Sequence, residues 1–166
     1  MAKERDMYPT ANDLSEKVRS EAVRLLNARL ADAIDLQTQV KQAHWSVKGP
    51  HFISLHKLFD EVNEAVEEYV DEIAERAVQL GGTVEGTARS IAKRSTLSEY
   101  PLQASTGKEH VTALTAALAA FGKNVRQAIS DADRIGDVDT TDLFTEISRG
   151  LDKWLWFVEA HSQAKE

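Results

Sequence analysis

Apolar residues recur at intervals of three and four along four segments of the chain, which is the spacing of a buried helix face. No stretch alternates apolar and polar residues as a half-buried strand would. The pattern predicts four amphipathic helices and no sheet. These run from about Asp13 to the "VKGP" stop, from just after Pro50 to the glycine pair at 81–82, from about Thr106, and from near Asp139 or Thr140.

Two of these starts carry a capping-box pattern, in which a short polar residue is followed three positions later by Glu: Asp13 with Glu16, and Thr106 in "TGKE". The connection from 81 to 105 is too long for a hairpin turn, and its "GTARSIAKR" stretch could form one short helix. Such a crossing can join parallel helices. The predicted fold is an all-α, ferritin-like four-helix bundle with a long crossover between helices two and three.

Composition narrows the class of protein. The 166 residues suit one domain over 1–166, with 1–12 as a short N-terminal tail. The 20 Lys and Arg against 27 Asp and Glu give a net charge of −7, which suits cations better than nucleic acid. No cysteine is present, so the chain fits a reducing compartment, and cytoplasm is the default. The longest nearly apolar run, "VTALTAALAAF", is 11 residues, too short to span a membrane.

Histidines and carboxylates cluster in the second predicted helix and just before it. Residues 41–62 hold three of the five histidines. His56 and Asp60 are spaced i,i+4, as are Asp71 and Glu75, so each pair projects from one helix face. Imidazole and carboxylate are ligands for iron, manganese and zinc. Asp60 and Asp71 are separated by about 16 Å along a helix, so one chain cannot close both pairs around one metal.

His56 with Glu75, and Asp60 with Asp71, are centred on the same point of the helix, near residue 65 or 66. If two copies of this helix pack antiparallel about a twofold axis there, His56 lies opposite the partner subunit's Glu75, and Asp60 opposite the partner subunit's Asp71. His44 lies about as far before the "VKGP" turn as His56 lies after it, so it can join the same cluster. The alternatives are a solvated acidic face and a histidine that packs at a helix end.

The stretches "KQAHWSVKGPHFISLHKLFDEVNEAVEEYVDEIAERAVQLGG" and "DLFTEISRGLDKWLWFVEAH" resemble Dps, the DNA-binding protein from starved cells, or mini-ferritin. The resemblance runs through all four helices. It implies a homo-oligomeric shell of twelve subunits with ferroxidase activity, which oxidises Fe(II) with hydrogen peroxide in preference to dioxygen. The shell stores ferric mineral and so protects against oxidative damage. The catalytic iron ligands it implies are His44, His56 and Asp60 of one subunit with Asp71 and Glu75 of its twofold partner, with zinc or manganese as competitors.

The resemblance also points to residues for iron entry and mineral growth. Asp137, Asp142 and Glu146 match the spacing of family residues that line an acidic threefold pore, although acids at a helix start also favour the helix dipole. Other exposed acids would start the mineral on the inner surface, unless they form only a solvated face. These nucleation candidates are Glu61, Glu64 and Glu68.

Four further residues lie near the site or remain unassigned. Trp45 follows the first ligand and is expected to pack near the centre, with a structural or a redox-related role. His51 stands where family members often carry a neutral amide, and a solvated loop histidine is favoured over an auxiliary metal contact. His110 and His161 have no identified partners and are expected to be surface or packing residues.

Weak or absent DNA binding is predicted despite the family name. Family members that bind DNA usually use a basic tail, whereas residues 1–13 here carry Lys3 and Arg5 against three acids. The competing hypothesis is a nucleoid-associated, DNA-condensing structural protein for which iron is secondary.

Overall fold

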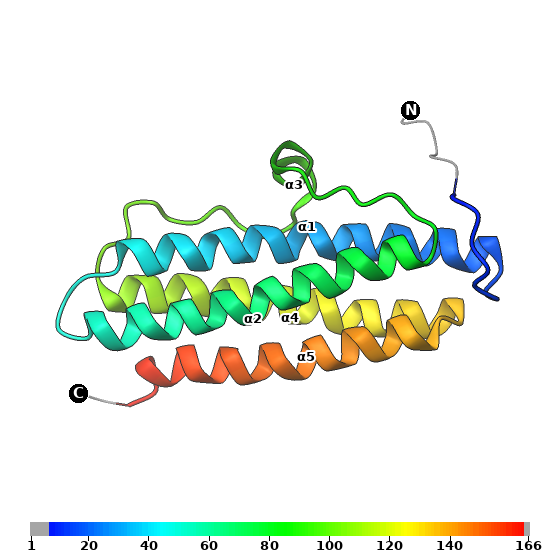
Figure 1. The fold of residues 1–166 in the computed structure, drawn as a ribbon. Coiled ribbons are helices and arrows are strands. Elements are labelled where there is room, and N and C mark those ends of the chain that lie inside the picture. The colour runs from blue at the N-terminus through cyan, green and yellow to red at the C-terminus, as the bar shows by residue number, and fades with distance from the viewer. Residues whose placement is uncertain (1–6, 165–166) are drawn as a thin grey trace.

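The computed structural model describes residues 7–164 and contains five α-helices, followed by the 3₁₀ turn η1 (Ala160–Ser162). Four long helices lie side by side as a bundle, and the short α3 lies outside it beside α1 (Figure 1). No strand occurs between residues 7 and 164, and no helix in that range is long and apolar enough to cross a membrane. The predicted all-α bundle is confirmed. Its helices are α1 (Glu16–Ser46), α2 (Phe52–Gln79), α3 (Ala88–Arg94), α4 (Gly107–Ile135) and α5 (Val138–Glu159).

The core of the bundle is filled by the periodic apolar residues of all four long helices. Leu26 of α1, Phe59 of α2, Phe121 of α4 and Phe144 of α5 are among its fully buried side chains. Burial of each such side chain contributes roughly 1.5–3 kcal/mol to folding. The apolar faces therefore hold the four helices together. The polar faces stay outside the core, where their side chains can bind ligands.

The predicted crossover is present between α2 and α4. The chain leaves α2 at one end of the bundle, runs along α1 with α3 about halfway, and enters α4 at the other end (Figure 1). As a result α2 and α4 run in the same direction. The short helix lies within the predicted "GTARSIAKR" stretch.

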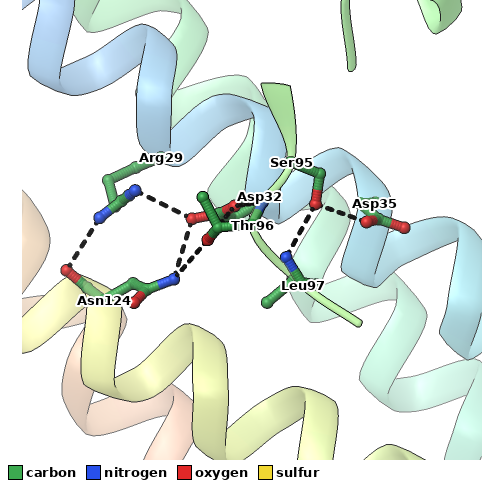
Figure 2. A network of polar contacts seen from close by, with 7 residues as sticks. All are labelled: Arg29, Asp32, Asp35, Ser95, Thr96, Leu97 and Asn124. Atoms are coloured by element: carbon green, nitrogen blue, oxygen red, sulfur yellow. Dashed lines mark hydrogen bonds and ion pairs between the residues drawn. The ribbon is translucent and has the colours of Figure 1, made fainter. Parts of the chain in front are cut away.

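Buried polar contacts fix this crossover to the bundle (Figure 2). Asp32 of α1 is fully buried and accepts hydrogen bonds from the backbone N of Thr96 at 2.8 Å and from Asn124 Nδ2 of α4 at 3.1 Å. Arg29 forms an ion pair with the same carboxylate at 3.0 Å. Because a buried charge is tolerated only when it is paired and hydrogen-bonded, these contacts make Asp32 the anchor of the crossover.

The first helix begins later than predicted. Ser15, and not Asp13, is the N-cap of α1, and its hydroxyl accepts a hydrogen bond from the amide of Val18 at 3.3 Å. Asp13 lies in the turn before the helix, where the Asn12 side chain accepts from the amide of Leu14 at 3.0 Å. The local turn therefore moves the cap by two residues.

The starts of α4 and α5 are also set by side-chain caps. The predicted capping box of Thr106 and Glu109 is present in full. The last helix begins at Val138, slightly earlier than predicted, because the Asp137 carboxylate accepts from the amide of Thr140 at 3.1 Å. Asp137 is thus an N-cap residue.

We expect Gly150→Ala to destabilise the contact between α2 and α5. A methyl group at Gly150 would lie 1.9 Å from the Tyr69 hydroxyl oxygen, and overpacking of this kind costs about 1–3 kcal/mol. Gly122→Ala is the matched control, because the nearest atom to its methyl group, Arg126 Nη2, lies at 3.6 Å. This control should raise the free energy of unfolding by up to about 1 kcal/mol through helix propensity. Urea denaturation at equal protein concentration measures both, and equal shifts would contradict the clash.

Candidate metal centre

Two of the predicted ligands meet where the first two long helices are joined. His44 lies in the last turn of α1 and His56 in the second turn of α2, with the 47–51 turn between them. Their rings stack with centroids 3.8 Å apart and planes inclined by 20°. The helical hairpin therefore brings the two imidazoles to the same height, as the sequence spacing predicted.

Reciprocal hydrogen bonds orient both rings. His44 Nδ1 donates to the backbone carbonyl of His56 at 2.7 Å, and His56 Nδ1 donates to the carbonyl of His44 at 2.8 Å. A carbonyl oxygen only accepts, so each Nδ1 carries a proton. In the neutral rings the lone pair then lies on Nε2. Histidines that ligate metals are commonly held in this way through their other nitrogen, so the arrangement presents two Nε2 atoms as ligands.

Asp60 lies beside this pair and is held by a cation that the sequence analysis did not single out. Lys41 Nζ is 2.5 Å from Asp60 Oδ1, and the same oxygen is 3.8 Å from His44 Nδ1. The Lys41 hydrogen bond and the nearby histidines hold the pKa of Asp60 below its usual range, so the carboxylate is ionised and able to bind a cation. Lys41 could have been found from its position one helical turn before His44.

The Lys41 ion pair is weak enough to be displaced. The side chains of Lys41 and Asp60 are 32% and 42% exposed. Solvated pairs of this kind contribute at most about 1 kcal/mol. A divalent cation that approached the two imidazoles would therefore replace the ammonium group at little cost.

The other two predicted ligands lie apart from this half of the site. Asp71 and Glu75 are exposed on α2, about 16 and 22 Å further along the helix axis than Asp60. Within residues 7–164, no three His, Asp or Glu side chains are grouped so that they could hold a metal ion. The single chain thus presents the two halves of the predicted site at separate places.

The acidic residues proposed for mineral nucleation occupy the solvent side of α2. Glu61, Glu64 and Glu68 are exposed, as are Asp142 and Glu146 of α5. Partial burial raises the pKa of the neighbouring Glu72, and the negative charges of Glu146, Glu68 and Asp71 add to the increase. The pore candidate Glu146 and the nucleation candidate Glu68 therefore both lie near Glu72.

Asp137 differs from its predicted role as a pore residue. Its side chain is only 1% exposed, and Arg76 Nη2 lies 2.8 Å from Oδ1. Its other oxygen accepts from the Thr140 hydroxyl at 2.5 Å. The carboxylate is occupied by the ion pair and by the cap of α5, so it is not free to attract cations in a pore. Asp142 and Glu146 remain candidates.

The two residues predicted near the site are both open to solvent in the chain. Trp45 follows His44 at the end of α1 and is 68% exposed in the single chain, so its packing near a centre shared with a second subunit stays a prediction. His51 is exposed at the N-cap position of α2 and forms no side-chain cap hydrogen bond, which fits the solvated loop histidine that was favoured.

The two unassigned histidines are one packing residue and one surface residue, as predicted. His110 is fully buried, and its Nδ1 is 2.5 Å from the Tyr100 hydroxyl. Burial lowers the pKa of His110, while the nearby Ser46 backbone and Glu109 act in the opposite direction. His161 is exposed, and its Nδ1 lies 3.0 Å from the backbone carbonyl of Phe157.

Comparison with known proteins gives the family of this bundle. Residues 23–165 match the model of the ferritin-like domain. The chain is 42% identical over 158 residues to the "DNA protection during starvation protein" of Agrobacterium fabrum, covering 95% of this chain and 98% of that protein. The solved Mycobacterium smegmatis Dps matches with a TM-score of 0.90 and 33% identity over 96% of this chain and 90% of its own.

A second solved relative is described in an iron-loaded state. Dps from Microbacterium arborescens "in the high iron form" matches with a TM-score of 0.85 and 30% identity, covering 93% of this chain and 99% of that one. The matches extend over nearly the whole length of each protein, and so include the α1–α2 hairpin that carries the histidine pair. This chain therefore belongs to the Dps family of ferritin-like proteins.

Proposed function

We propose that this protein is an iron-oxidising and iron-storing mini-ferritin. Iron is its substrate and its cargo. The observation that carries the proposal is the stacked His44–His56 pair, whose reciprocal hydrogen bonds through Nδ1 leave Nε2 of each ring as the ligand atom, with the ionised Asp60 next to His44. Two imidazoles and a carboxylate suit Fe(II), and the solved relative in a high iron form supports this choice of metal. Zinc and manganese would compete for the same donors.

The proposed reaction is the oxidation of two Fe(II) ions by one hydrogen peroxide, which takes up two protons and yields two Fe(III) ions and two water molecules. Neutral imidazoles hold the iron without making the site strongly anionic. Carboxylates from Asp60, and from Asp71 and Glu75 of the twofold partner, would offset the positive charge gained on oxidation. Delivery of both electrons at one place avoids release of hydroxyl radical, so the same chemistry would protect the cell.

The complete site requires a second subunit in this proposal. The halves of the site are separated in one chain, whereas an antiparallel pairing of two α2 helices brings Asp71 and Glu75 opposite the histidine half. The surface also has apolar groups that a single chain leaves uncovered, including Val138 at 72% and Trp156 at 59% exposure. These support a closed homo-oligomer, for which we propose twelve subunits and a cytoplasmic location.

Iron entry and mineral growth are assigned to the exposed acids. We propose that Asp142 and Glu146 line an acidic entry pore, because both side chains are free and lie near the start of α5. Three copies around an axis would lower the electrostatic potential for cations. The exposed carboxylates of α2 would bind the first ferric ions inside the shell. These are Glu61, Glu64 and Glu68.

The proposal is tested by adding anaerobic Fe(II) and then stoichiometric hydrogen peroxide to the purified protein. Ferric absorbance and the co-elution of iron with protein in size-exclusion chromatography are followed. We expect about two Fe(II) oxidised per peroxide and iron that elutes with the shell. Asp60→Asn should abolish rapid oxidation, whereas the exposed Asp13→Asn should not. Precipitated iron beside an intact wild-type shell would contradict the proposal.

DNA condensation is the less supported function. Relatives are named for DNA protection. In this chain, however, the backbone near the N-terminus is bonded to the bundle, because Tyr8 N donates to Gly81 O at 2.8 Å. Lys3 and Arg5 lie outside the described residues, and the stretch that follows them is held against the end of α2. Residues 1–13 carry more acidic than basic side chains and so offer few phosphate contacts, and we propose weak or absent DNA binding at physiological salt.

A further inference from the structure

A basic pocket of about 720 Å³ lies at the end of the bundle away from the N-terminus. The α1–α2 turn, the start of α4 and the C-terminal end of the chain meet there (Figure 1). Four basic side chains line it, Lys48, His51, Lys108 and His161, and none of the lining residues within 7–164 is acidic. In a chain with 27 acidic residues and a net charge of −7, this absence makes the pocket an isolated positive region.

The two lysines of this basic pocket are not held in ion pairs. No residue among 7–164 forms an ion pair with Lys48 or Lys108. The acid next to Lys108 in the sequence, Glu109, does not line the pocket, because its carboxylate accepts from the backbone amides of Ser105 and Thr106 at 3.0 and 2.9 Å. These hydrogen bonds lower the pKa of Glu109 to about 2.

Two long helices also begin at the basic pocket. His51 and Thr106, the N-cap residues of the 28-residue α2 and the 29-residue α4, both line it. Backbone amides in the first turn of a helix lack partners within the helix, and the helix dipole adds a partial positive charge at that end. The partial positive charges of two helix starts thus add to the cationic side chains of the same cavity, while the amides of Ser105, Thr106 and Glu109 are already bonded within the capping box.

We infer that the basic pocket binds a small phosphate anion. The two ammonium groups supply charge, and a phosphate group has enough oxygens to accept from them and from the imidazoles at once. Free inorganic phosphate fits better than the phosphates of DNA, because the donors converge in a concavity on a protein whose overall charge repels a polyanion. The inference does not depend on the proposed iron chemistry.

The test is isothermal titration calorimetry, in which inorganic phosphate is added to the intact assembly of the full chain at physiological ionic strength. We expect saturable binding that the double variant Lys48→Gln/Lys108→Gln weakens about tenfold or more, since each substitution removes a charged hydrogen-bond donor. Lys17→Gln/Lys123→Gln is the matched control, with two exposed lysines that do not line the pocket. Circular dichroism verifies that each variant is folded.

Further arms separate the possible sources of the phosphate group. A nucleoside monophosphate that competes with inorganic phosphate would show that the pocket accepts phosphate esters, which supports the inference. Retention of a DNA duplex that is lost only in the double pocket variant, without any binding of free phosphate, would overturn it in favour of a polyanion surface. Absence of saturable phosphate binding to the wild-type assembly, or equal weakening in the control variant, would also overturn it.

Discussion

Asp60→Ala chains and Glu75→Ala chains should each lose iron oxidation when assembled alone and recover part of it when assembled together. If the site is shared between two subunits, each mixed dimer contains one site with both changes and one site with neither. Random assembly at equal amounts should restore about a quarter of the wild-type sites, because half of the dimers are mixed. Each variant alone should be slower by roughly 100-fold, since even residues that only support metal ligands contribute about 10–100-fold.

The measurement is the initial rate of ferric absorbance after peroxide is added to co-expressed shells with separable tags. The matched control mixes Asp60→Ala with His56→Ala chains, both of which damage the same half of the site. Every site in those mixed dimers has a damaged histidine half, so no activity should return. Recovery in both mixtures, or in neither, would show that the five residues do not form a site between two subunits.

The bundle and half of the site could be predicted because both depend on local sequence. Apolar spacing fixes which helix faces are buried, and the glycine pair and the Thr106 capping box mark helix ends by backbone chemistry. The distance of His44 and His56 from their shared turn likewise places them at one height. These features need no knowledge of residues remote in the sequence.

The features that were missed depend on contacts between distant segments. The fully buried Asp32 is satisfied by Thr96 and Asn124, which lie 64 and 92 residues further along the chain. The pairing of Arg76 with Asp137 spans 61 residues, so an acidic stretch before a helix could not reveal that one of its acids is enclosed.

Asp137→Ala should be among the most destabilising single substitutions in the chain. It removes the N-cap of α5 and leaves the Arg76 guanidinium, which is 12% exposed, without its closest carboxylate. Loss of one member of a buried ion pair costs about 3–5 kcal/mol, because the remaining charge stays desolvated. Asn at this position should cost less, since it can still accept from the amide of Thr140 as a cap.

Asp139→Ala is the matched control, since this carboxylate lies 3.9 Å from the same Arg76 nitrogen but is 85% exposed. A solvated pair contributes less than about 1 kcal/mol, so urea denaturation should separate the two variants clearly. Iron entry gives the second readout: Asp142→Asn should slow oxidation at limiting Fe(II), whereas Asp137→Asn shells that remain assembled should not. Slow iron oxidation at limiting Fe(II) in Asp137→Asn shells of normal stability would show that Asp137 does line the pore. It would also mean that the Arg76–Asp137 ion pair opens in the assembled shell.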